Sequence, residues 1–204
     1  NNIDIDICGK IVLATNKIQA KKLLELKING EKNGLKDLKI LNSNELKKIE
    51  PNAAGNAALF VPESGIIDYK QTTKKFAEKI TSINKKSKII LSCEVLNFNN
   101  NFLLTSKGKI YTKNNIFCAG LFSDRLAKKD NLNTNMKIVG FRGDYYKLKD
   151  SSRHKVNNLI YPVPNPEFPF LGVHLTRMTD GSIECGPNAV YSFKREGYNK
   201  FSFN

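Results

Sequence analysis

The sequence predicts an α+β protein in which one domain is interrupted by another. Residues 65–134 combine helices with short apolar strands that suit a parallel, α/β-type arrangement, and segments typical of an antiparallel sheet lie on both sides of them. A chain of 204 residues is long enough to bury one large core or two small ones. We therefore expect residues 1–64 and 135–204 to form one domain and residues 65–134 to form part of a second.

The first 64 residues alternate between strands and helices. GKIVLA at 9–14 predicts a buried strand, and residues 16–33 predict a helix that ends at Asn33-Gly34, a typical C-terminal stop. LKIL at 38–41 predicts a second strand. A short helix is expected from Ser43, as its N-cap, to Glu50, because Pro51 stops it. AALFVP at 57–62 predicts a third strand.

The middle stretch opens with a longer helix, from about Asp68 to Ile83, with Asp68 as its cap. Its apolar stripe consists of Phe76, Ala77, Ile80 and Ile83. Strands are then expected at KIILSCEVLNF (88–98), FLLTS (102–106), KIYT (109–112) and NIFCAG (115–120). A short helix, FSDRLAKK at 122–129, follows the last of these strands.

Strands predominate from residue 137 onward. They are expected within KIVGFRGDYYKLK (137–149), NLIYPVP (158–164), FLGVHLT (170–176) and SIECG (182–186). Asp180-Gly181, between the last two, is the usual signal of a tight hairpin.

The net charge of +14 invites a nucleic-acid interpretation, which we do not favour. The positive charge is mostly lysine spread along the chain, and the chain has five arginines: Arg125, Arg142, Arg153, Arg177 and Arg195. A nucleic-acid site usually gathers arginines and exposed aromatic residues on one face. The charge is better suited to attracting anionic substrates or lipid headgroups.

The four cysteines, Cys8, Cys93, Cys118 and Cys185, are far apart and form no CxxC pair. We expect reduced thiols in a cytoplasmic protein, with Cys93 and Cys118 in the core, and neither disulfides nor a metal site. No run of apolar residues is long enough to span a membrane.

His174 is the best candidate for a general base, because a neutral imidazole can take a proton from a hydroxyl group near pH 7. In the predicted strand it shares a face with Gly172 and Thr176, and Arg177 lies on the other face. A structural role for His174 remains the alternative. Arg142, beside Gly143, could bind a carboxylate or form a surface ion pair. Ala119-Gly120 joins a strand to a helix, where backbone amides can meet an anion.

Several segments occur together and in order: GKIVLAT, VPESGIIDY, CAGLFSDRLA, IVGFRGDYYKL and LIYPVPNPEFPFLGVHLTRMTDGSIECGPNAV. With them the chain resembles the L-2-hydroxyglutarate oxidases and dehydrogenases, FAD-dependent oxidoreductases related to the D-amino-acid and glycine oxidases. The resemblance runs through almost the whole chain. It implies a two-lobed fold with an FAD-binding α/β domain and a substrate domain of mixed, largely antiparallel sheet. Such enzymes open with GxGxxG, which this chain lacks, so we expect it to be an internal fragment.

The resemblance also implies site residues. Val95, Ala119 and Gly120 fall where the family contacts FAD. The residues that fall where the substrate lobe faces the flavin are Arg142, Tyr161, His174 and Asn188, and Thr176 and Arg177 are added as polar partners for a dicarboxylate.

The expected reaction is oxidation of L-2-hydroxyglutarate to 2-oxoglutarate, with hydride transfer to flavin and His174 as base. The electron acceptor, oxygen or a quinone, stays open, and the positive charge allows peripheral association with the inner membrane. Three alternatives remain: a glycine- or sarcosine-type amine oxidase, a basic module that binds nucleic acid or a membrane surface, and a non-catalytic truncated product.

Overall fold

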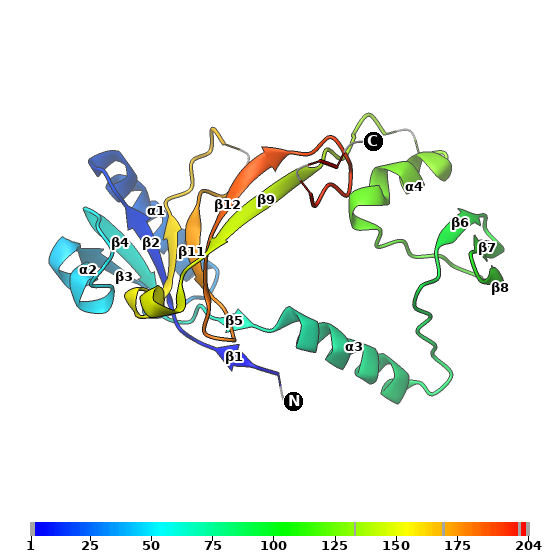
Figure 1. Ribbon diagram of the computed structural model, residues 1–204, viewed down its shortest axis with the longest axis horizontal. Helices are drawn as coiled ribbons and strands as arrows, with labels where there is room; N and C mark the ends of the chain where they lie inside the picture. The colour runs from blue at the N-terminus through cyan, green and yellow to red at the C-terminus, as the bar shows by residue number, and fades with distance from the viewer. Residues whose placement is uncertain (1–2, 133, 169, 200, 203–204) are drawn as a thin grey trace. The chain divides into compact units, whose positions relative to one another are not determined.

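The computed structural model describes residues 3–132, 134–168, 170–199 and 201–202. The chain divides into two compact units (Figure 1). The first consists of Asn1–Lys75 and Gly143–Val190, and the second of Phe76–Arg142 and Tyr191–Asn204. Each unit is therefore built from segments that are far apart in the sequence.

The first unit is built on a mixed sheet of seven strands in the order β3-β4-β2-β10-β11-β12-β9. The bounds are β3 Lys39–Asn42, β4 Ala57–Val61, β2 Lys10–Ala14, β10 Leu159–Pro162, β11 His174–Arg177, β12 Ile183–Tyr191 and β9 Phe141–Lys147. The pairing of β2 with β10 is parallel. The pairs β3–β4, β4–β2, β10–β11 and β11–β12 are antiparallel. The central parallel pair brings strands about 150 residues apart in sequence side by side, Leu159 opposite Lys10.

Two helices cover opposite faces of the β2 end of this sheet. Helix α1 (Lys17–Lys32) packs its fully buried Leu23 with Ala14, Leu59 and Val163. Helix α2 (Ser43–Ile49) packs its fully buried Leu46 with Ile11, Leu41 and Ala58. Successive strand residues point to opposite faces, so Ile11 and Ala14 serve different clusters.

The α2 cap corrects the prediction that Ser43 begins the helix as its N-cap. The side chain of Asn42 accepts hydrogen bonds from the N–H groups of Asn44 and Glu45, at 2.9 and 3.0 Å. The Glu45 carboxylate in turn accepts one from the N–H of Asn42 at 2.8 Å, which completes a capping box. Ser43 is thus the first helical residue.

A short two-stranded sheet joins β1 (Ile5–Asp6) to β5 (Ile66–Ile67), which leads into α3 (Tyr69–Ile83). Asp68 caps α3 as predicted, since its carboxylate accepts the N–H of Gln71 at 2.9 Å. The stripe residues Phe76, Ile80 and Ile83 are all exposed. A 3-10 helix, η2 (Asp150–Lys155), lies between β9 and β10.

The second unit contains the sheet β6-β7-β8, the 3-10 helix η1 and helix α4. Their bounds are β6 Val95–Phe98, β7 Phe102–Thr105, β8 Gly108–Tyr111, η1 Gly120–Phe122 and α4 Ser123–Lys129. The guanidinium of Arg195 donates to both carboxylate oxygens of Asp124, at 2.6 and 3.1 Å. This nearly buried pair holds the segment around Arg195 against α4.

Two strand predictions in this unit are wrong in extent or kind. The strand expected over 88–98 is formed only from Val95 onward, and 115–120 is not a strand. Within the described residues no strand pairs with 88–94 or 115–120, so their backbone groups cannot enter a ladder. Ile116 is 90% exposed. Within the described residues this apolar segment is therefore not buried.

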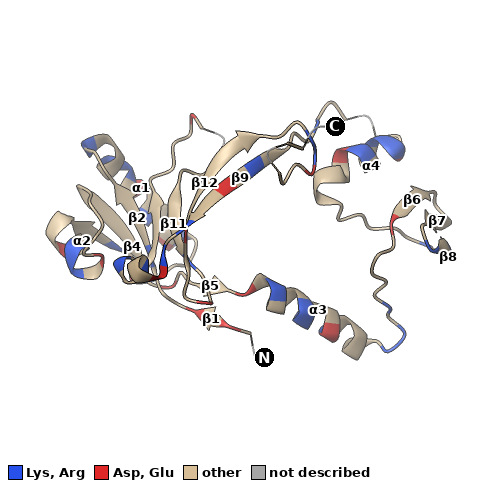
Figure 2. Cartoon of the chain, viewed as in Figure 1, with Lys and Arg blue, Asp and Glu red and all other residues tan. Residues whose placement is uncertain are grey.

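Two of the cysteines were also expected in the core and are not buried there. All four thiols are free, but Cys118 is exposed and Cys93 is half-buried, so the prediction that both belong to the core is wrong. Figure 2 shows lysine and arginine residues on each labelled helix, in line with positive charge spread along the chain. None of the described helices has both the length and the hydropathy needed to cross a membrane.

Candidate active site

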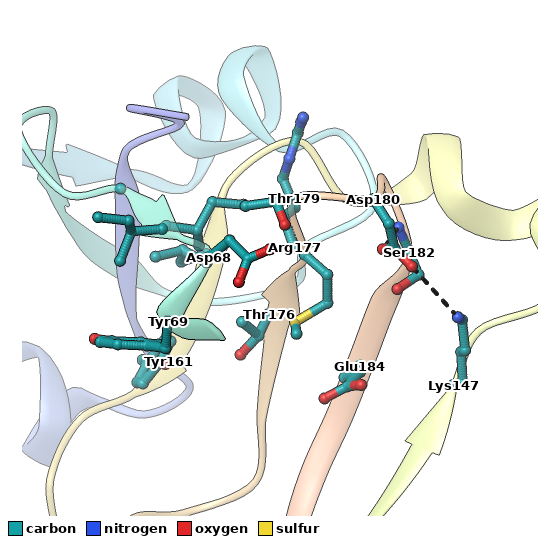
Figure 3. Close-up of a pocket in the computed structure, with 15 residues that line it drawn as sticks. Asp68, Tyr69, Lys147, Tyr161, Thr176, Arg177, Thr179, Asp180, Ser182 and Glu184 are labelled. Carbon is teal, nitrogen blue, oxygen red and sulfur yellow. Dashed lines mark hydrogen bonds and ion pairs between the residues drawn. The ribbon is translucent and has the colours of Figure 1, made fainter. Parts of the chain in front are cut away.

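A cavity of about 590 Å³ opens on one face of the large sheet (Figure 3). Its floor comes from β10, β11 and β12, and one wall comes from β5 and the start of α3. The polar residues around it are Asp68, Tyr69, Lys147, Tyr161, Thr176, Arg177, Thr179, Asp180, Ser182 and Glu184. A cavity of this size is in the range that takes a small ligand.

Tyr161 and His174 form an aromatic stack on the sheet face that carries the cavity. Ile160 lies opposite Leu175 in the antiparallel β10–β11 pair, so Tyr161 lies beside His174 on one face. Their ring centroids are 4.1 Å apart and the ring planes differ by 18°. Tyr161 lines the cavity of about 590 Å³, and with His174 it also lines a second one of about 340 Å³.

The imidazole of His174 is held in one orientation. It is buried, and its Nδ1 lies 2.9 Å from the carbonyl oxygen of Gly172. A carbonyl oxygen only accepts hydrogen bonds, so Nδ1 carries a proton, and in the neutral form of such a ring the lone pair is on Nε2. A Cβ on Gly172 would lie 2.8 Å from the ring of Pro162, so glycine lets this segment pass close to β10. The arrangement presents a base with a fixed tautomer.

Lys10 joins this stack from β2. Its Nζ lies 4.8 Å from the centroid of the Tyr161 ring, a cation–π distance. Lys10 lies opposite Leu159 in the parallel β2–β10 pair, so it points to the same face as Tyr161. The sequence offers a weak signal for Lys10, a charged residue at the start of a buried strand, and our reading of the sequence missed it.

Thr176 and Arg177 leave β11 toward opposite faces, as the alternation in the sequence predicts. Thr176 shares the face of His174, beside Tyr161 and Glu184 in Figure 3. The Arg177 guanidinium donates to the backbone oxygen of Asn157 at 2.8 Å and to the Asp6 carboxylate at 3.2 Å. The charge of Arg177 is therefore already engaged by groups of the protein.

The charged groups around the cavity have both signs. Lys147 and Asp180 lie 3.8 Å apart as an exposed ion pair. Hydrogen bonds from Ser182 hold the pKa of Asp180 below its usual value. Thr179, Asp180 and Gly181 form the β11–β12 turn, with Gly181 at φ +76° and Met178 donating to the Ser182 carbonyl at 2.8 Å. The turn is a three-residue loop that ends in a left-handed glycine, at the Asp-Gly pair where the sequence predicts a hairpin.

A buried carboxylate, Glu50, lies behind the strand that carries Tyr161. It is fully buried and accepts the N–H groups of Asn157 and Asn158, which directly precede β10. Burial raises the pKa of Glu50 above its usual value. Nothing in the sequence around Glu50 pointed to this role, because its partners lie more than 100 residues away.

The remaining predicted site residues lie in other places. Asn188 is an exposed residue of β12, and Arg142 is a half-buried residue of β9 that belongs to the second unit. Val95 begins β6, and Ala119-Gly120 leads into η1, all in the second unit. The structure thus brings together Tyr161, His174 and Thr176.

The mixed sheet with helices is an α+β architecture, and the comparisons give the family. The chain belongs to the family of FAD dependent oxidoreductases, whose model matches residues 1–203. Solved structures with the same fold include an FAD-bound L-alpha-glycerophosphate oxidase from Mycoplasma pneumoniae. Its TM-score is 0.77 at 24% identity, and the match covers 92% of this chain and 51% of that one. L-proline dehydrogenase from P. horikoshii matches with a TM-score of 0.76 at 20% identity, over 92% of this chain and 50% of that one.

Curated relatives are more similar in sequence. The L-2-hydroxyglutarate dehydrogenase of Indibacter alkaliphilus is 45% identical over 208 aligned residues, which cover all of this chain and 52% of that protein. The enzyme of the same name from Escherichia coli K12 is 41% identical over all of this chain and 49% of its own length. The chain therefore spans about half the length of the curated relatives that it matches.

Proposed function

We propose that the protein of which this chain is part oxidises L-2-hydroxyglutarate to 2-oxoglutarate with FAD as cofactor. The observation that carries the proposal is the buried His174, whose Nδ1–H is bound to the Gly172 carbonyl and whose Nε2 is left to act as a base. The relatives named L-2-hydroxyglutarate dehydrogenase support the choice of substrate, because their identity extends over all of this chain.

The described residues are compatible with FAD. Gly120 is exposed, has φ +51°, and would have no atom within 4 Å of a Cβ, so a bulky group has room to approach this turn. We propose that Ala119 and Gly120 hold FAD there and that the backbone of Val95 contacts its adenine. When bound, FAD supplies the hydride acceptor for C2 of the substrate. By this proposal residues 65–134 belong to the FAD lobe, and the stretches before and after them belong to the substrate lobe.

The protein's own groups then have separate tasks. His174 Nε2 takes the proton of the substrate's 2-hydroxyl as C2 loses its hydride, so that a ketone can form. The hydroxyls of Tyr161 and Thr176 donate hydrogen bonds to substrate oxygens in the cavity. We propose Arg142 and Asn188 as further substrate ligands, because a dicarboxylate requires cationic and amide donors. The four free thiols support a location in the cytoplasm, and the spread positive charge supports peripheral contact with an anionic membrane.

The test uses the full-length protein with flavin bound. Flavin absorbance is followed in a stopped-flow instrument after addition of L-2-hydroxyglutarate, for wild type, His174→Ala and His154→Ala. Removing a general base slows a reaction by about 10²–10⁴-fold, so His174→Ala should lose flavin reduction by substrate while dithionite still reduces it. His154 is an exposed residue of η2 and serves as the matched control, with wild-type rates expected.

Other outcomes point to the alternatives. Flavin that is reduced by glycine or sarcosine but not by L-2-hydroxyglutarate would make the protein an amine oxidase. Near wild-type reduction of His174→Ala would leave His174 with a structural role. Absence of flavin, with salt-sensitive binding to DNA or anionic vesicles, would favour the basic binding module.

A further inference from the structure

Arg177 connects the floor of the cavity to the strand that lies behind its wall. Its guanidinium meets the carboxylate of Asp6 on β1 at 3.2 Å and the carbonyl oxygen of Asn157 at 2.8 Å. The two partners are 171 and 20 residues away in sequence. A planar guanidinium can serve both acceptors at once, which the point charge of a lysine does less well.

Strand β1 is in turn fixed to the cavity wall. Asp6 lies opposite Ile66, and Ile5 lies opposite Ile67, in the antiparallel β1–β5 pair. Asp4 extends the connection. Its carbonyl accepts the N–H of Asp68 at 3.1 Å, and its carboxylate accepts the side-chain amide of Gln71 at 2.7 Å. The segment 65–69, which lines the cavity, is therefore held from behind by β1.

The floor and the wall meet at this connection. Thr176, directly before Arg177, lines the cavity floor, and Ile66, opposite Asp6, lines its wall. The side chain of Arg177 is about one-third exposed and that of Asp6 less than half, so both charges are partly shielded from water. A second anchor lies on the Asn157 side, because its N–H is bound to buried Glu50 at 2.9 Å.

We propose that Arg177 is a positioning residue for the proposed reaction: through Asp6 and β1 it holds the wall at 65–69 at a fixed distance from the floor. It therefore sets the width available to the substrate, and its charge does not contact a substrate carboxylate. The predicted effect on KM rests on the proposed function. The predicted role of Arg177 in holding the segment 65–69 rests on its contacts alone.

The test compares Arg177→Gln, Asp6→Asn and the double variant in the full-length protein. Hydrogen–deuterium exchange is measured by mass spectrometry on peptides that cover 3–8 and 65–71. Each single variant should raise exchange in both peptides, and the double variant should add little to Arg177→Gln, since both changes break the Arg177–Asp6 ion pair. A peptide covering α2 at 43–49 should be unchanged, which would show that the unit remains folded. Lys27→Gln, which breaks the exposed Lys27–Glu31 pair on α1, is the matched control.

Steady-state kinetics provide the second measurement. Both single variants should raise KM for L-2-hydroxyglutarate several-fold by the same factor and leave kcat within about twofold of wild type. If Arg177 bound the substrate directly, Arg177→Gln would raise KM and Asp6→Asn would not, and the proposal would be overturned. Unchanged exchange at 65–71 in both variants would also overturn it. If L-2-hydroxyglutarate is not turned over by wild type, the proposed function fails, while the exchange result still decides the role of Arg177.

Discussion

The aromatic stack on the sheet gives a prediction that separates the ring of Tyr161 from its hydroxyl. The centroid of the ring lies 4.1 Å from that of His174 and 4.8 Å from the Lys10 ammonium, and Tyr161 lines the cavity. Tyr161→Phe keeps the ring and removes the hydroxyl. Tyr161→Leu keeps an apolar side chain but removes both ring contacts. If the ring orients the base, the two variants should differ in the rate at which substrate reduces the flavin.

The size of the difference follows from the contacts. An aromatic pair of this geometry contributes about 0.5–1.5 kcal/mol beyond its buried area. A cation–π contact at a partly exposed site adds about 0.5–1 kcal/mol. Losing both contacts should therefore cost about 1–2.5 kcal/mol. At about 1.4 kcal/mol per factor of ten, the kcat/KM of Tyr161→Leu should be about 5–70-fold lower than that of Tyr161→Phe.

The assay is steady-state turnover of L-2-hydroxyglutarate by the full-length protein, with stopped-flow flavin reduction to isolate the chemical step. Tyr161→Phe should raise KM, because a hydrogen-bond donor to the substrate is lost, and Tyr161→Leu should in addition lower the rate of flavin reduction. Lys10→Met removes only the cation and should reproduce part of the Tyr161→Leu effect. Equal reduction rates in Tyr161→Leu and Tyr161→Phe would refute the idea that the ring orients His174.

Three further predictions concern two carboxylates that bridge distant segments, Glu50 and Asp124. Glu50→Ala leaves the N–H of buried Asn158 without a partner while that of exposed Asn157 regains water. Urea unfolding should therefore show a loss of about 2–4 kcal/mol, made up of the unpaired donor and the cavity, and a loss below about 0.5 kcal/mol would contradict this assignment. Burial raises the pKa of Glu50 above 4.5 in the folded state, so the folded state binds this proton more tightly than the unfolded state does. The contribution of Glu50 to the free energy of unfolding should therefore fall as the pH rises above about 4.5. Glu50→Gln should abolish that fall. The hydrogen bond from Arg195 lowers the pKa of Asp124 from 3.8 to about 2, so its stabilisation should be present above pH 3.8 and be lost as pH falls toward 2. Acid titration followed by circular dichroism should show this loss in wild type and not in Asp124→Asn.

The helices were the most predictable part of the fold because their signals are local. The helix predicted over 16–33 is observed as Lys17–Lys32, and Gly34 adopts φ +89° just beyond it, as the Asn33-Gly34 stop requires. The Asp68 cap is confirmed for the same reason, since its partner Gln71 is three residues away. The Ser43 cap was wrong by one residue because Asn42 offers a similar side chain that also pairs with Glu45.

Strands were less predictable because a strand exists only where a second strand pairs with it. NIFCAG at 115–120 has the apolar composition of a buried strand, yet no described strand lies beside it. LIYP within 158–164 has a weaker pattern, since this range contains two prolines, but it becomes β10 because β2 and β11 flank it on either side. Whether a segment becomes a strand depends on partner strands far away in the sequence, and the local hydrophobic periodicity of the segment does not reveal them.

The distance in sequence between partners also explains which features of the site the sequence could predict. Alternation along 174–177 places His174 and Thr176 on one face and Arg177 on the other, and the structure agrees. Alternation does not supply the partners: Tyr161 reaches His174 through the β10–β11 register, and Asp6 reaches Arg177 from 171 residues away. The partly buried guanidinium of Arg177 requires acceptors, because burying it without one is costly. The contacts of Arg177 with Asp6 and Asn157 support the proposal that its charge serves the scaffold.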